Sequence, residues 1–298
     1  MAKIVNYDQE MIDFKPTKDF FVGIDSDGCV FDAMELKHKE CFIPSTINVW
    51  GLQTVSRFAR EVHEFVNLYS KWRGLNRWRN IIRTMDMLQE HPEVKRRGFE
   101  CPNIEGLRGF VQSGASLSDA GLYGYMREHA SPDLYQGARW SSDVNSAIEH
   151  ICHGLMPFAP VKPSFEALKG QADLACVSAT RNNDLAREWT YAGILDDVEL
   201  LCGQEVGTKE RILALTAQNK YPKDHILMMG DAPGDMAAAH ATGALFFPIN
   251  PGYEADSWDR FYNEGYKKFL DGTYAGAYEE KLIADFEKLL PEKAPWEK

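Results

Sequence analysis

Residues 20–28 read FFVGIDSDG: a short apolar run ends in two aspartates one residue apart, followed by a glycine. The run has the length of a buried strand. Open α/β sheets place their chemistry at the carboxyl ends of strands, which is where Asp25 and Asp27 would lie. Two neighbouring buried carboxylates are costly unless a cation or a shared proton compensates them. The stretch therefore predicts a functional site at the end of a strand.

The second half of the chain predicts the rest of a sheet. Apolar runs separated by segments of helical periodicity lie at 172–178, 197–201, 225–229 and 244–247. Alternating strands and helices favour a parallel sheet with both faces covered, and the strand at 20–25 must join it because alone it has no partner. We therefore predict an α/β fold with a doubly wound parallel sheet. The polar residues 1–19 are expected to form a leader over its core.

Between residues 33 and 154 the periodicity is helical. Val55, Phe58, Val62 and Phe65 recur at intervals of three and four residues, as on one face of a long helix. Further helices are expected at 75–90, 117–129 and 142–153, with loops over 98–114, where glycine and proline are frequent. We predict a discontinuous α/β catalytic core of residues 1–32 plus 155–298, and an inserted all-helical cap of residues 33–154.

Composition limits the partners. The chain has 298 residues and a net charge of −11, which disfavours a nucleic-acid backbone as a partner. No apolar run approaches the roughly 18 residues that span a membrane, and the acidic N-terminal segment does not resemble a signal peptide. The six cysteines include no C-x-x-C pair. These features predict a cytoplasmic protein with neither a nucleic-acid nor a membrane partner; they do not indicate an oligomeric state.

The predicted strand ends carry polar side chains that would share one edge of the sheet. They are Asp25 and Asp27, Ser178, and Asp231 with Asp235 one helical turn later; Lys209 begins an intervening helix. Converging carboxylates make a hard-oxygen site suited to Mg²⁺, which keeps several of its waters. A hydroxyl and a lysine beside such a metal suit a phosphoryl group, and a carboxylate can attack phosphorus to form an aspartyl phosphate.

These motifs, in this order, resemble the haloacid dehalogenase (HAD) superfamily. The matching pieces are Asp25-x-Asp27-Gly28 after a strand, Ser178 at a strand end, Lys209, and Gly230-Asp231-x-x-x-Asp235 after a strand. The resemblance implies a HAD-like Rossmannoid core with a cap after the first motif. It favours the Asp-x-Asp phosphatase and phosphotransferase branch, because the dehalogenase branch lacks the second aspartate. Cys29, where threonine is frequent in the family, and the long cap depart from the pattern.

The resemblance also implies roles for single residues. Asp25 corresponds to the nucleophile, and Asp27 to the general acid and then the general base. Asp25, the backbone carbonyl of Asp27 and Asp231 correspond to the magnesium ligands. Asp235 corresponds to a partner of the metal or of the lysine, and its contact with the metal is direct, through another residue or through water. Ser178, Lys209 and nearby backbone N–H groups such as that of Ala179 correspond to the clamp on the phosphoryl oxygens.

The predicted cap contains a basic and aromatic cluster, WRGLNRWR at residues 72–79. Arg73 and Arg77 share one helical face if the helix begins early enough. One interpretation is recognition of an anionic or ring-bearing substrate. The other is a solvated helix face with packed tryptophans, and the sequence leaves both open.

The sequence thus predicts a Mg²⁺-dependent phosphatase that hydrolyses a small phosphorylated metabolite through an aspartyl phosphate. A phosphomutase or another phosphotransferase would share every core residue. A non-catalytic regulatory protein is a third possibility, which loss of Asp25, Asp27, Lys209 or Asp231 would favour; all four are present.

Overall fold

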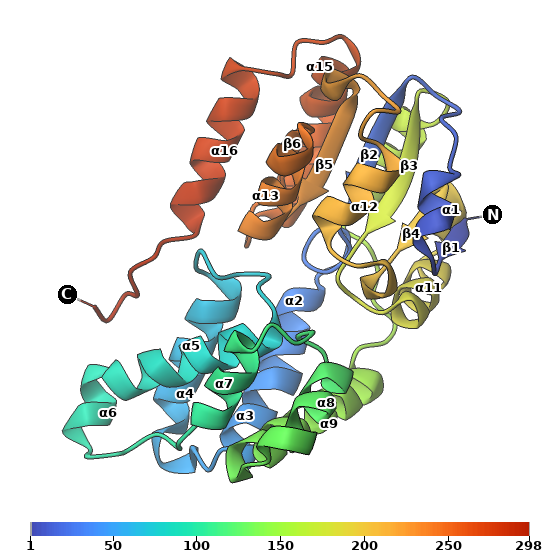
Figure 1. Cartoon of the computed structure of the whole chain (residues 1–298). Coiled ribbons are helices and arrows are strands. Elements are labelled where there is room, and N and C mark those ends of the chain that lie inside the picture. Colours follow the sequence, from blue (N-terminus) through green and yellow to red (C-terminus); the bar gives the residue numbers. More distant parts are fainter. Residues whose placement is uncertain (1, 298) are drawn as a thin grey trace. The chain divides into compact units, whose positions relative to one another are not determined.

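The structure, a computed structural model, describes residues 2–297 and divides into two compact units. The first contains the described residues up to Met34 together with Gly154–Leu289. The second contains Glu35–His153 and the described residues from Leu290 onward. Figure 1 labels most of the helices and strands of the two units.

The first unit is built on a six-stranded parallel sheet with the strand order β1-β4-β3-β2-β5-β6. The strands are β1 (Lys3–Val5), β2 (Phe20–Ile24), β3 (Ala172–Val177), β4 (Leu200–Cys202), β5 (Ile226–Gly230) and β6 (Leu245–Pro248). β2 lies between β3 and β5, so the apolar run at residues 20–24 is a central strand. The predicted α/β fold with a parallel sheet is confirmed.

Helices cover both faces of this sheet, as in a doubly wound fold. They are α1 (Asp8–Ile12), α10 (Val161–Leu168), α11 (Asn182–Tyr191), α12 (Lys209–Thr216), α13 (Pro233–Thr242), α14 (Glu254–Arg260), α15 (Tyr266–Leu270) and α16 (Ala277–Leu289). Val22 and Ile24 of β2 belong to a cluster with Trp189 of α11 and Trp258 of α14. A Cβ at Gly23 would point to the other face of the sheet and meet Leu213 of α12. Successive residues of β2 thus contact different layers.

The second unit is helical, as predicted for the cap. Its helices are α3 (Ile43–Val49), α4 (Ser56–Leu68), α5 (Arg77–Glu90), α6 (Pro92–Arg96), α7 (Glu105–Gln112), α8 (Asp119–His129) and α9 (Pro132–Ile151), and α2 (Ala33–Leu36) lies at the boundary with the first unit. The predicted apolar stripe of Val55, Phe58, Val62 and Phe65 belongs to the same buried cluster as Trp78 of α5 and Trp140 of α9. None of the helices formed by residues 2–297 is long and apolar enough to cross a membrane.

Three expectations need correction. Residues 1–19 are more than a leader, because β1 adds an edge strand beside β4. The segment 98–114 contains α7, in which Leu107 and Phe110, three residues apart, are fully buried. The tail from Leu290 belongs to the helical unit rather than the core: the Trp296 ring lies 5.5 Å from that of Phe65, and Lys71 pairs with Glu292 at 2.6 Å.

Candidate active site

The end of β2 places Asp25 in the protein interior. Asp25 is 6% exposed, and its N–H donates to the carbonyl oxygen of Met229 at 3.0 Å, which continues the pairing of β2 with β5. Its Oδ1 accepts the N–H of Ser26 at 2.7 Å. Gly28 has a φ of 77°, in the left-handed region that glycine adopts without strain, and its N–H donates to Phe31 at 2.8 Å. The glycine thus turns the chain directly after the two aspartates.

Three buried carboxylates gather at the ends of β2 and β5. Asp25, Asp231 and Asp235 each offer an oxygen within 4.8 Å of the others. Asp231 and Asp235 are each 1% exposed. A Cβ at Gly230 would collide with the Asp235 side chain, so the glycine of the Gly230-Asp231-x-x-x-Asp235 motif makes room for the last aspartate.

Lys209, the first residue of α12, lies against two of these carboxylates. Its Nζ is 2.6 Å from Asp25 Oδ2 and 2.5 Å from Asp235 Oδ1. Thr208 caps this helix by accepting the Arg211 N–H at 3.2 Å. Burial alone would lower the pKa of Lys209, but Asp235 and Asp25 outweigh burial and raise that pKa above its ordinary value. Lys209 is therefore a half-buried ammonium group.

The cluster carries an electrostatic cost that Lys209 offsets only in part. Burial raises the pKa of Asp25 well above its ordinary value, Lys209 opposes that rise, and Asp235 and Asp231 add to it. The thiol of Cys29 is close enough to respond as well: burial, then Asp25 and Asp231, raise its pKa, so it remains a neutral thiol. Further positive charge among the three carboxylates would lower this cost.

The carboxylates fit a divalent cation by their chemistry and their closeness. Asp235 Oδ1 contacts Lys209, and its Oδ2 accepts the Ala232 N–H at 3.0 Å. Both oxygens of Asp235 thus have protein donors, and so do both oxygens of Asp25, which contact the Ser26 N–H and Lys209, so these contacts do not rank the two carboxylates as metal ligands. Asp25, Asp231 and Asp235 each offer a carboxylate oxygen, and hard carboxylate oxygens are the ligands that Mg²⁺ prefers.

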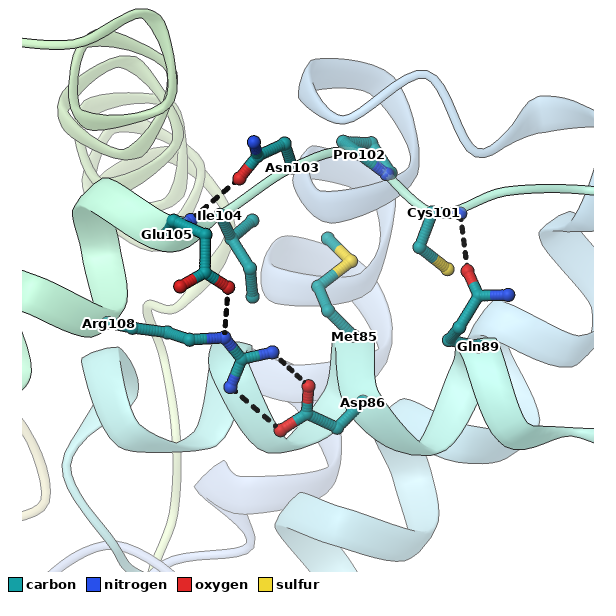
Figure 2. A pocket seen from close by; sticks show the side chains of 9 residues that line it. All are labelled: Met85, Asp86, Gln89, Cys101, Pro102, Asn103, Ile104, Glu105 and Arg108. Atoms are coloured by element: carbon teal, nitrogen blue, oxygen red, sulfur yellow. Dashed lines mark hydrogen bonds and ion pairs between the residues drawn. The ribbon is translucent and has the colours of Figure 1, made fainter.

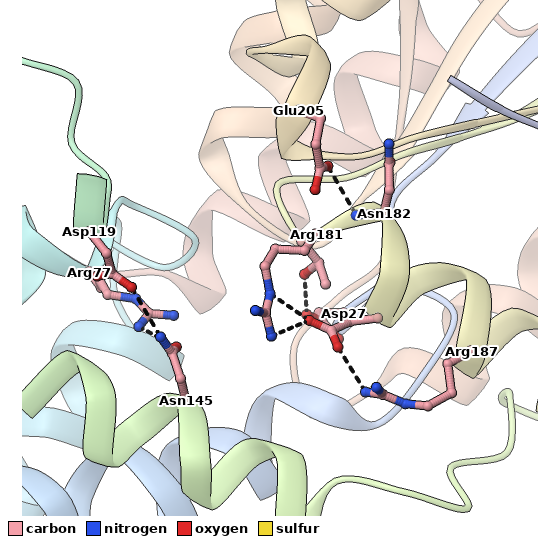
Figure 3. Close-up of polar contacts among 10 residues, drawn as sticks. Asp27, Arg77, Asp119, Asn145, Arg181, Asn182, Arg187 and Glu205 are labelled. Carbon is pink, nitrogen blue, oxygen red and sulfur yellow. Dashed lines mark hydrogen bonds and ion pairs between the residues drawn. The ribbon is translucent and has the colours of Figure 1, made fainter. Parts of the chain in front are cut away.

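Asp27 is anchored to the loop that follows β3. Its Oδ2 accepts a hydrogen bond from Thr180 Oγ1 at 2.9 Å. Ser178 extends β3 through an N–H bond to Cys202 at 2.9 Å, and its buried Oγ accepts the Thr180 N–H at 3.2 Å. Figure 3 shows Asp27 near Arg181 and Asn182, at the start of α11. Sequence reasoning missed Thr180; the available signal was a hydroxyl two residues after Ser178.

The three candidate substrate residues have different surroundings. Ala179 is exposed, on the loop after β3. Arg73 and Arg77 belong to the helical unit. Arg73 is 2% exposed, and its Nη1 donates to the Leu68 carbonyl at 3.0 Å. Arg77 is half-buried, begins α5 and donates to Asn145 Oδ1 at 2.8 Å (Figure 3). These contacts give both arginines a structural role within their unit, and substrate binding by them stays a prediction.

A shallow cavity of about 310 Å³ also lies in the helical unit (Figure 2). Met85 and Ile104 supply apolar surface, and Arg108 pairs with Asp86 and Glu105 along one wall. Because the arginine partly neutralises the two acids, we assign no chemical step to this cavity.

Comparison with known proteins returns matches among solved structures alone: no family model matches the chain, and no curated protein does. A predicted phosphoglycolate phosphatase from Haemophilus somnus is 16% identical, with 78% of this chain and 86% of that chain covered and a TM-score of 0.47. A putative phosphoglycolate phosphatase from Lactobacillus plantarum is 11% identical, with 81% and 91% covered and a TM-score of 0.41. Haloacid dehalogenases also match, among them a defluorinating L-2-haloacid dehalogenase at 16% identity, 78% and 83% coverage and a TM-score of 0.33.

Structural matches this distant give no information about the substrate, and the chemistry of this chain has to be inferred from its own site. The ordered motifs converge at the carboxyl edge of a parallel sheet, where Asp25, Lys209, Asp231 and Asp235 meet. In its motifs and in their placement on the sheet the chain is similar to the HAD superfamily, and matching solved structures include hydrolases described by that superfamily's name.

Proposed function

We propose that this chain is a HAD-type hydrolase that removes phosphate from a small phosphomonoester through an aspartyl phosphate on Asp25. One observation carries the proposal: Asp25 lies among two further buried carboxylates and in contact with Lys209, at the carboxyl edge of the sheet. A structural aspartate gains nothing from such a position, because its burial beside like charges destabilises the fold. A nucleophile that acts on a metal-bound phosphoryl group requires such an environment.

The proposed chemistry uses two aspartates in two steps. In the first, a carboxylate oxygen of Asp25 attacks phosphorus, the bond from phosphorus to the ester oxygen breaks, and Asp27 gives its proton to the departing alcohol. In the second, water attacks the phosphorus of the aspartyl phosphate and passes a proton to Asp27. The bond to Asp25 then breaks and inorganic phosphate leaves. The second aspartate also favours phosphate ester hydrolysis over dehalogenation, which needs no acid for the leaving group.

The remaining residues would bind charge and fix geometry. Asp25 and Asp231 would hold Mg²⁺ directly, with the Asp27 carbonyl as a third protein ligand. When bound, Mg²⁺ supplies electrostatic stabilisation of the phosphoryl oxygens. Lys209 and the Ser178 hydroxyl would contact those oxygens, and Asp235 would hold Lys209 in place through its 2.5 Å contact.

The test is hydrolysis of p-nitrophenyl phosphate by the full chain, with Mg²⁺ and with EDTA. We expect Mg²⁺-dependent release of inorganic phosphate, abolished in Asp25→Asn. Asp224→Asn is the matched control, because Asp224 is an exposed aspartate of the same unit. Absence of phosphate release with Mg²⁺, or undiminished release by Asp25→Asn, would count against the proposal. Once activity is established, a screen of phosphorylated metabolites identifies the preferred leaving group.

A further inference from the structure

We propose that Thr180 is a positioning residue that orients Asp27 relative to Ser178, an inference that rests on the function proposed above. Thr180 contacts both residues with different atoms. Its Oγ1 donates to Asp27 Oδ2 at 2.9 Å, and its N–H donates to Ser178 Oγ at 3.2 Å. A single residue therefore joins the group assigned to proton transfer with a group assigned to the phosphoryl clamp, across 153 positions in the sequence.

The loop that carries Thr180 is itself held in place by the loop after β4. The Gln204 N–H donates to the Thr180 carbonyl at 3.0 Å, and the Gly203 N–H donates to Asn182 Oδ1 at 2.8 Å. Glu205 Oε2 accepts the Asn182 N–H at 3.0 Å (Figure 3). A Cβ at Gly203 would lie 2.5 Å from the Thr180 carbonyl oxygen, so a glycine is required for this close approach. The backbone of Thr180 is thus held by contacts that are independent of the one between its side chain and Asp27.

A fixed hydroxyl suits this position for a chemical reason. An aspartate carboxylate rotates readily about its terminal bond, since that torsion has broad minima. A hydrogen bond to Oδ2 restricts the rotation and so defines the direction of Oδ1. A hydroxyl can donate to a carboxylate and can accept from a carboxylic acid, so the contact persists while Asp27 gives and regains its proton. A lysine or arginine offers donors alone.

The experiment compares Thr180→Val, which keeps the side-chain shape, with Thr180→Ser, which keeps the hydroxyl. The readout is kcat/KM for phenyl phosphate and for p-nitrophenyl phosphate, because phenol is the poorer leaving group and needs the proton of Asp27 more. Loss of a hydrogen bond to a charged group corresponds to roughly 10- to 100-fold in rate. We expect a loss of that size in Thr180→Val against phenyl phosphate, a clearly smaller loss against p-nitrophenyl phosphate, and near wild-type values in Thr180→Ser.

Thr190→Val is the matched control, because Thr190 is an exposed threonine of α11 in the same unit. We expect it to match the wild type against both esters. Equal losses against the two esters in Thr180→Val, or a Thr180→Ser variant as impaired as Thr180→Val, would overturn the positioning role while leaving the proposed function intact. Inactivity of the wild-type chain against both esters with Mg²⁺ would overturn the proposed function, and this inference with it.

Discussion

Replacement of Lys209 by methionine tests how much this lysine contributes to the free energy of unfolding by compensating the carboxylate cluster. Lys209 Nζ lies 2.6 Å from Asp25 Oδ2 and 2.5 Å from Asp235 Oδ1. Its side chain is 17% exposed, against 8% for Asp25 and 1% for Asp235. Methionine keeps much of the length and removes the charge. Removal of one member of a buried ion pair costs about 3–5 kcal/mol, because it leaves a buried charge uncompensated. The residual exposure of Lys209 places our expectation at the lower end, about 3 kcal/mol.

The assay is urea unfolding in EDTA, followed by tryptophan fluorescence. The control is Lys169→Met, which removes an exposed pair with Glu166 whose side chains are 69% and 62% exposed. Such surface pairs contribute about 0–1 kcal/mol. We expect Lys209→Met to unfold at a much lower urea concentration with an unchanged slope, and Lys169→Met to remain close to the wild type. A loss below about 1 kcal/mol in Lys209→Met would refute the reasoning that the cluster depends on this lysine.

Two further predictions concern the metal and pH. Mg²⁺ should raise the melting temperature of the wild type and of the exposed control Asp224→Asn, but not of Asp231→Asn, because a ligand stabilises the state that binds it; an equal rise in Asp231→Asn would exclude Asp231 as a ligand. In the helical unit, burial lowers the pKa of His63 to about 3 and, with nearby His63 and Arg73, lowers that of His38 as well. The unfolded chain therefore binds protons first, and stability should fall as pH drops from about 6.5 towards 3. In urea titrations, His63→Gln should reduce the dependence of the free energy of unfolding on pH by about 1.4 kcal/mol per pH unit. The exposed control His153→Gln should show the same dependence as the wild type. If His63→Gln also matched the wild type, the lowered pKa of His63 would be contradicted.

The sequence was sufficient where a strong local pattern coincided with tertiary placement. The apolar run at 20–24 is a central strand, and Lys209 begins a helix, as expected. The convergence of Asp25 with Asp231 follows from parallel strands alone, since parallel strands end at one edge of a sheet.

Features that depend on distant contacts were not readable from the sequence. The three residues of β1 are too few to show a periodicity, and their strand exists because β4 offers a free edge. The described residues after Leu289 join the helical unit, and Trp296 among them contacts Phe65, which lies far away in the chain. The Thr180 contact with Asp27 likewise depends on the loop after β4, which fixes the threonine backbone.

For the basic residues, the sequence alone distinguished a role in the site from a structural role in one case and not in another. The arginines near residue 75 left open both a substrate-binding surface and a structural helix face, and Arg73 is buried and donates to the Leu68 carbonyl. Charge and spacing alone do not distinguish an arginine that binds a ligand from one that also supports its own unit. By contrast Lys209 was identifiable, because a lysine in the first turn of a helix opposes the helix dipole and so requires a separate reason.

The central claim is that Asp25 becomes phosphorylated, and trapping the acyl phosphate tests it most directly. The Asp27→Asn variant should accumulate the intermediate, since p-nitrophenol leaves without an acid whereas the second step lacks its base. After incubation with p-nitrophenyl phosphate and Mg²⁺, borohydride reduces an aspartyl phosphate to homoserine, which mass spectrometry of the peptide locates. We predict homoserine at position 25. Release of p-nitrophenol without modification of Asp25, or homoserine at another aspartate, would contradict the account.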